Sequence, residues 1–70
     1  MQVSYDKLWK LLIDNKMKRT DLKDAAGISS SSLAKLGKNK NVSMEVLKKI
    51  CRALACNVGD IMDIISSRNE

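Results

Sequence analysis

The spacing of apolar residues constrains the fold of this chain more than any other feature. After Ser43, a favourable N-cap residue, the apolar positions follow a helical period: Val46, Leu47, Ile50, Cys51 and Leu54. Basic side chains fall on the outer side of the same helix. No sustained alternation of polar and β-branched residues is present anywhere. The sequence therefore predicts an all-α fold without strands.

Four other segments show the same period and complete a set of five expected helices. In chain order they are residues 4–15, 18–26, 29–36 and 60–65, with Ser4 and Ser29 as N-caps of the first and third. We expect Gly27 to end the second helix, because glycine adopts the left-handed conformation after a last helical turn at little cost. Gly37 is expected to stop the third helix.

The length and composition predict one globular domain, residues 1–70. A chain of 70 residues buries only about 60% of the surface that its unfolded form exposes, so one core is expected. Hydrophobic residues make up 44% of the chain and charged residues 30%, a balance typical of globular proteins. No aliphatic run approaches the roughly 20 residues that cross a bilayer, and no signal-peptide pattern follows Met1. We therefore expect a cytoplasmic protein without membrane association.

The sequence argues against a metal centre and against catalysis. It has no histidine, and its two cysteines, Cys51 and Cys56, lack the CxxC spacing of a zinc or redox site. We expect reduced thiols that pack as small apolar groups. No glycine-rich phosphate loop and no nucleophile with a plausible base are present. We therefore expect neither an enzyme nor a cofactor, and no small-molecule effector domain.

The net charge of +5 originates in the middle of the chain. Residues 16–44 contain seven basic and two acidic residues, which account for +5, and the rest of the chain contains six of each. A basic half joined to a neutral half is typical of a surface that binds phosphates, although solvated lysines are common on any protein. The same window contains the second and third expected helices.

These two short helices have the arrangement of a helix-turn-helix (HTH) motif. A tight turn with Gly27 joins them, and a run of serines opens the second helix. The side chains that would fix the two helices at a steep angle are Leu22, Ile28, Leu33 and Leu36. The N-terminal end of the second helix would then project into a DNA major groove, with residues 30–36 as the recognition helix.

The chain resembles the phage-repressor and Cro-type HTH regulators, often called the XRE family. The resemblance covers residues 17–65 and is carried by Leu22, Ala26-Gly27-Ile28-Ser29, Ser32-Leu33-Ala34-Lys35-Leu36, Val42-Ser43, Val46-Leu47-Lys48-Lys49-Ile50, Ala53-Leu54 and Gly59-Asp60-Ile61. It implies a five-helix lambda-repressor-like DNA-binding domain, with the HTH at helices two and three. It also implies a repressor or activator that reads double-stranded DNA as a dimer. Gly37-Lys38-Asn39 departs from the family's usual Glu-x-Gly after the recognition helix.

The resemblance, carried over position by position, implies that Ser30, Ser31 and Lys35 face base edges. Lys35 could donate to guanine O6 or N7. Contacts to the DNA backbone would come from six other residues: Arg19, Ser29, Ser32, Lys38, Asn39 and Lys40. An ordinary solvated face is the alternative for the lysines, and helix capping with solubility is the alternative for the serines. Tyr5 and Trp9 are interpreted as core or rim residues rather than base-stacking ones.

The apolar C-terminal segment indicates how two copies of the chain could assemble. Ile61 and Ile65 lie four apart on one face of the expected last helix, with Ile64 beside them, and so short a helix cannot bury all three in a small core. We expect a two-fold homodimer through this helix and the region of Val3 and Trp9, which would set two recognition helices about one DNA turn apart. The alternative function is a protein-interaction module, such as an antitoxin or adaptor, that binds its partner through this apolar end.

Overall fold

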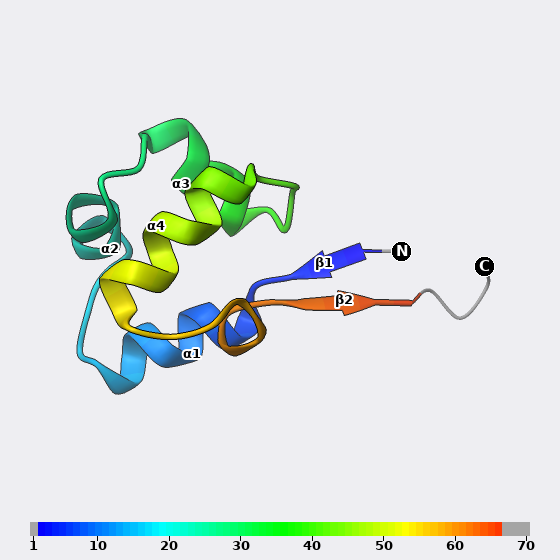
Figure 1. The fold of residues 1–70 in the computed structure, drawn as a ribbon, viewed down its shortest axis with the longest axis horizontal. Coiled ribbons are helices and arrows are strands. Elements are labelled where there is room, and N and C mark those ends of the chain that lie inside the picture. Colours follow the sequence, from blue (N-terminus) through cyan, green and yellow to red (C-terminus); the bar gives the residue numbers. More distant parts are fainter. Residues whose placement is uncertain (1, 67–70) are drawn as a thin grey trace.

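The structure is a computed structural model that describes residues 2–66. Its elements follow one another as β1 (Gln2–Ser4), α1 (Asp6–Asp14), α2 (Arg19–Ala26), α3 (Ser30–Gly37), α4 (Met44–Leu54), the 3-10 helix η1 (Val58–Asp60) and β2 (Asp63–Ile65). Figure 1 shows a helical body from which the two strands extend side by side as a narrow ribbon. The first four predicted helices are confirmed, within one or two residues at each end.

The core lies between the helices, with α4 running through the middle of the helical body (Figure 1). The largest fully buried side chains come from almost every part of the fold: Tyr5, Leu8, Leu22, Leu36, Ile50 and Ile61. Ile50 and Leu47 belong to the apolar stripe that predicted α4, and this stripe faces inward as expected. None of the helices in residues 2–66 is long and apolar enough to span a membrane.

All four α-helices of residues 2–66 end with the same backbone motif. One residue near each end has a positive φ: Lys16 (56°), Gly27 (69°), Asn39 (54°) and Ala55 (52°). In each case the next amide donates to the carbonyl five residues earlier, as from Met17 to Leu12 at 2.8 Å and from Lys40 to Lys35 at 2.9 Å. At the end of α3, the left-handed residue is Asn39, and asparagine tolerates this conformation well. The helix thus includes Gly37 and runs one residue further than predicted.

The predicted fifth helix at residues 60–65 is wrong, and so is the prediction of a fold without strands. Asp60 ends the short η1, where its carboxylate accepts a hydrogen bond from the Asn57 amide at 2.9 Å. The chain then extends as β2 and pairs antiparallel with β1, in the register Gln2 with Ile65, Val3 with Ile64 and Ser4 with Asp63. The β-branched Ile64 and Ile65 suit a strand.

Lys7 links α1 to the ribbon and to η1. The ammonium of Lys7 lies 3.0 Å from the Asp63 carboxylate and donates to the Gly59 carbonyl at 3.2 Å. Ser4, expected as the N-cap of the first helix, is instead the last residue of β1, and Tyr5 is the N-cap. The Ser4 hydroxyl still accepts a hydrogen bond from the Asp6 amide at 3.3 Å.

Candidate nucleic-acid interface

The α2–turn–α3 unit has the geometry predicted for an HTH motif. Gly27 adopts the left-handed conformation after α2, which lets the chain turn sharply toward α3. Leu22 and Leu36 are completely buried, and Ile28 in the turn is 6% exposed. These three side chains pack into one core, whereas Leu33 is only half-buried. The turn between the helices is therefore fixed by burial on its inner side, and its outer side stays exposed.

The N-terminus of α3 is capped by Ser29, as predicted. The Ser29 hydroxyl accepts a hydrogen bond from the Ser32 amide at 3.1 Å and donates to the Ser32 hydroxyl, also at 3.1 Å. The amides of Ser30 and Ser31 belong to the first helical turn, where no carbonyl of the same helix can accept from them. Such amides, at the positive end of the helix dipole, are a favourable place for a phosphate oxygen.

The outer face of α3 carries the residues predicted to meet base edges. Ser30, Ser31 and Lys35 are all exposed. Helical spacing places Ala34 between them on the same face, and Ala34 is exposed as well. Sequence reasoning missed Ala34 because a small apolar side chain carries no chemical signal of its own. Lys38 continues this face at the end of the helix.

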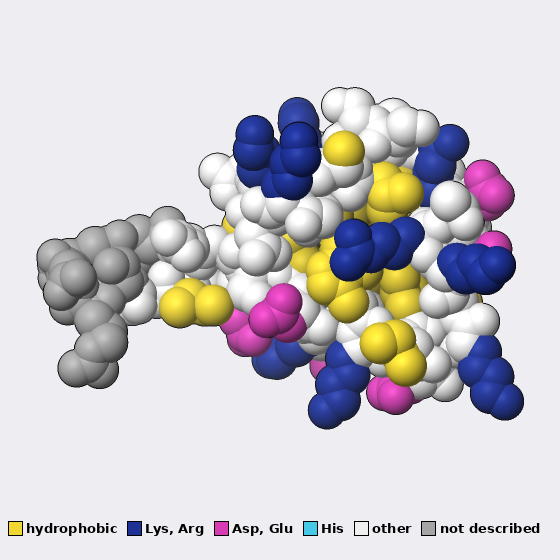
Figure 2. All heavy atoms as spheres, turned by 180° about the vertical axis from the view of Figure 1, so that it is seen from behind, with side chains coloured by type: hydrophobic (Ala, Val, Ile, Leu, Met, Phe, Trp, Pro, Cys, Tyr) yellow, Lys and Arg dark blue, Asp and Glu magenta, His cyan; other side chains and the backbone are white. Residues whose placement is uncertain are grey.

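Arg19 begins α2, and its guanidinium packs between α1 and the end of α3. The guanidinium carbon lies 3.9 Å from the centroid of the Trp9 ring in α1. A Cβ atom built on Gly37 would lie 3.2 Å from one guanidinium nitrogen. Trp9 itself is half-buried against the core, so it is a rim residue, as expected. Figure 2 shows Lys and Arg side chains spread around one whole face of the helical body, including some that lie beside exposed hydrophobic side chains.

The loop after α3 is held by Tyr5, which is only 1% exposed. Its amide donates to the Asn39 side-chain oxygen at 3.2 Å, and its hydroxyl donates to the Lys40 carbonyl at 2.8 Å. Burial raises the pKa of Tyr5. The side-chain oxygen of Asn39 is therefore engaged in the fold, which leaves its NH₂ group for the predicted DNA contact. A buried tyrosine hydroxyl needs a partner, and this need is the signal from which the role of Tyr5 could have been predicted.

The comparisons with known proteins agree with this geometry. The family described as the Cro/C1-type HTH DNA-binding domain matches residues 7–67, which is most of the chain. The chain belongs to this family. The residues matched include the whole α2–turn–α3 unit as well as α1 and α4.

Two individual proteins that the chain resembles are named as transcriptional regulators. The chain is 36% identical over 61 residues to a protein of Bacillus subtilis (strain 168) named as an uncharacterized HTH-type transcriptional regulator, YozG; the alignment covers 84% of this chain and 73% of that protein. It is also similar to the crystal structure of the transcriptional regulator VanUg, with a TM-score of 0.90 and 55% identity over 94% of this chain and 88% of the other.

Outside the HTH unit of this Cro/C1-type domain, the three isoleucines expected at a dimer interface are not equivalent. Ile61 is completely buried in the core, so it has no surface to offer to a second subunit. Ile64 and Ile65 are 60% and 49% exposed and lie on β2 rather than on a helix. The expectation of an interface on one helical face was therefore wrong in its geometry, although two of its three side chains are on the surface.

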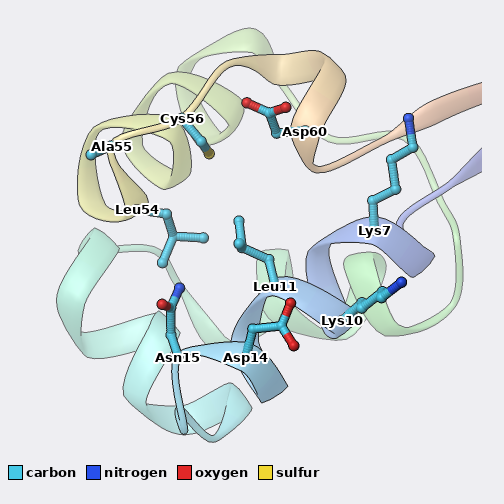
Figure 3. Close-up of a pocket in the computed structure, with 9 residues that line it drawn as sticks. All are labelled: Lys7, Lys10, Leu11, Asp14, Asn15, Leu54, Ala55, Cys56 and Asp60. Carbon is cyan, nitrogen blue, oxygen red and sulfur yellow. The ribbon is translucent and has the colours of Figure 1, made fainter.

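An open pocket of about 410 Å³ lies on the side of the Cro/C1-type domain formed by α1, the end of α4 and η1 (Figure 3). Leu11, Leu54 and Cys56 point into it, whereas charged side chains such as Lys10 and Asp14 lie around its rim. Cys56 packs beside Cys51, and burial together with this neighbouring thiol raises the pKa of Cys56. Both cysteines are free and half-buried, as reduced thiols packed at the edge of the core would be.

Proposed function

We propose that this Cro/C1-type HTH protein is a transcriptional regulator that binds double-stranded DNA with α3 in the major groove. The observation that carries the proposal is the outer face of α3. It combines exposed side chains able to reach base edges with the first-turn amides of Ser30 and Ser31, which have no acceptor within their own helix and where a phosphate can bind. The names of the two relatives, both transcriptional regulators, support the regulatory role.

We assign base readout to Ser30, Ser31 and Lys35, and we add Ala34 because it is exposed between them. Lys35 can donate to guanine O6 or N7, and the methyl group of Ala34 can contact the C5-methyl group of thymine. Serine hydroxyls donate and accept, so they accommodate several bases. Base selectivity in this arrangement therefore rests chiefly on Lys35 and Ala34.

Contacts to the DNA backbone are assigned to residues around that face. They are Arg19, Ser29, Ser32, Lys38, Asn39 and Lys40. Ser32 keeps a hydroxyl proton that it can donate to a phosphate while it accepts from Ser29. Each cation that neutralises a phosphate releases counterions, so these residues should make the affinity fall with salt.

We also propose that the protein binds DNA as a two-fold dimer through the ribbon. In residues 2–66 the sheet has two strands, so each strand has an outer edge with unpaired backbone groups. Ile64 and Ile65 add exposed apolar surface on its two faces. An isolated two-stranded ribbon is marginally stable in water, and pairing with the same ribbon of a second copy would satisfy one edge and place exposed isoleucines of the two copies side by side.

DNA binding over a series of salt concentrations tests the proposal, with Lys35→Ala, Lys38→Ala and the control Lys10→Ala. Lys10 lies on α1 beside the pocket of Figure 3, away from α3. We expect Lys38→Ala to weaken binding to all sequences alike and to reduce the salt slope by about 0.9. Lys35→Ala should relax sequence preference, and Lys10→Ala should do neither. No binding by the wild type at low salt would refute the proposal and favour a protein-interaction module.

A further inference from the structure

We propose that Trp9 is a positioning residue for DNA binding. Its ring holds the guanidinium of Arg19 beside the end of α3, where Arg19 meets a DNA phosphate, and Gly37 leaves the space for it. The inference rests on the proposed function, because it assigns a role within the same DNA-binding surface. It adds a residue of α1 that does not itself touch DNA.

The contact is a stacked cation–π interaction on a rigid support. The guanidinium carbon of Arg19 lies 3.9 Å from the ring centroid of Trp9, within the range in which the ring face attracts a cation. Trp9 is half-buried and packs against the core, so its ring is fixed by α1. Arg19 is exposed and has a long flexible side chain. The stack therefore restrains an arginine that would otherwise sample many rotamers, and less entropy is lost when it binds a phosphate.

Stacking restrains the guanidinium without using its hydrogen-bond donors. The N–H groups of arginine lie in the plane of the guanidinium, so a ring against its face leaves them free, whereas a carboxylate would occupy them. The ion pairs within residues 2–66 are Lys7 with Asp63 and Lys48 with Glu45, and neither includes Arg19. The stacked cation thus keeps both its charge and its donors for an anion.

The position of the stack points to a phosphate beside α3. One guanidinium nitrogen would lie only 3.2 Å from a Cβ at Gly37, the last residue of α3, so a side chain there would push the guanidinium by a few tenths of an ångström. Lys38 follows directly, and α3 carries the proposed base-reading face. Arg19 and Lys38 together therefore place two cations at the same end of the recognition helix, as a DNA backbone crossing that end would require.

A double-mutant cycle tests the positioning role, using a short DNA duplex selected for binding to the wild type. Trp9→Leu keeps an apolar side chain but loses the ring, and Trp9→Phe keeps a ring. Each is measured alone and with Arg19→Ala. We expect Arg19→Ala to weaken binding about tenfold and to reduce the salt slope by about 0.9. Trp9→Leu should weaken binding by about two- to fivefold, Trp9→Phe by less, and neither should have an effect when Arg19→Ala is present.

The same variants separate positioning from folding. Trp9 is the only tryptophan of the chain, so its fluorescence reports on the stack directly. Arg19→Ala should increase the quenching of this fluorescence by acrylamide, because the ring face loses its cover, and Lys10→Ala should leave it unchanged. Unchanged quenching in Arg19→Ala would overturn the inference. So would an equal loss of affinity from Trp9→Leu in both backgrounds, because the ring would then act through the fold alone. Either result can occur while Lys35 and Lys38 still govern binding, so the proposed function would survive.

Discussion

Replacing Gly37 with alanine should raise stability and lower DNA affinity at the same time. Gly37 is the last residue of α3 and does not have a positive φ, so alanine fits its backbone without strain. Alanine in a helix is more stable than glycine by about 0.5–1 kcal/mol. For a domain of this size, about 4–8 °C of melting temperature corresponds to 1 kcal/mol, so the expected rise is about 2–8 °C.

The loss of affinity follows from the space that the new methyl group would occupy. The added Cβ would lie 3.2 Å from a guanidinium nitrogen of Arg19, so the flexible end of the arginine must shift by a few tenths of an ångström over the Trp9 ring. The whole stack is worth about 0.5–1 kcal/mol, so the dissociation constant should rise by at most about two- to fivefold.

Two assays on the same samples check this prediction. Thermal unfolding followed by circular dichroism gives the stability, and fluorescence anisotropy with a labelled duplex gives the affinity. The matched control is Gly37→Ala combined with Arg19→Ala, which should keep the gain in stability but show no further loss of affinity relative to Arg19→Ala alone. A rise in stability with unchanged affinity would refute this prediction and show that Arg19 reaches its phosphate equally well from the shifted position. A fall in stability would show that the methyl group clashes with more than a movable side chain.

The fold leads to four further predictions. Ala55→Gly should stabilise the domain by about 1 kcal/mol in urea unfolding, because Ala55 has a φ of 52° that glycine adopts without strain; an unchanged midpoint would contradict it. Tyr5→Phe should destabilise the domain by about 1–3 kcal/mol, because the Lys40 carbonyl loses its partner. Since burial raises the pKa of Tyr5 in the folded state, the wild type should lose stability as the pH rises through the ordinary tyrosine pKa toward the folded one, and Tyr5→Phe should lack this loss. Ile64→Asp should give monomers in sedimentation at tens of micromolar where the wild type gives dimers, and a monomeric wild type would refute the ribbon interface.

Local signals predicted the helical body well. Each of the first four helices has an apolar stripe, and α2, α3 and α4 also have an end signal in nearby sequence: Gly27, Ser29 and Ser43. The same local signals predicted the HTH unit, because its turn is short and its core residues are close in sequence. The exposure of the predicted base-contact residues was also predictable, since helical spacing alone places Ser31 and Lys35 on the solvent-facing side of the helix.

Features that depend on distant partners could not be predicted in this way. The isoleucines of residues 60–65 fit a helical face or a strand equally well, and pairing with Val3 at the other end of the chain decides between them. Three-residue strands are also too short to show a clear alternation. The role of Gly37 also depends on a distant partner. Its sequence context predicts only the end of a helix, and the need for a small residue becomes apparent from the Arg19 side chain beside it.

The pairing of β1 with β2 places the formation of the ribbon after the assembly of the helices during synthesis. Contacts between neighbouring helices are local and can form early, whereas the ribbon joins segments from opposite ends of the described chain. During synthesis, α1 to α4 can therefore assemble while Val3 still has no partner strand and Lys7 has no Asp63. The ribbon, and any interface built on it, can form only after residue 65 has left the ribosome. Assembly of two copies would then come after the helical body of each one is complete.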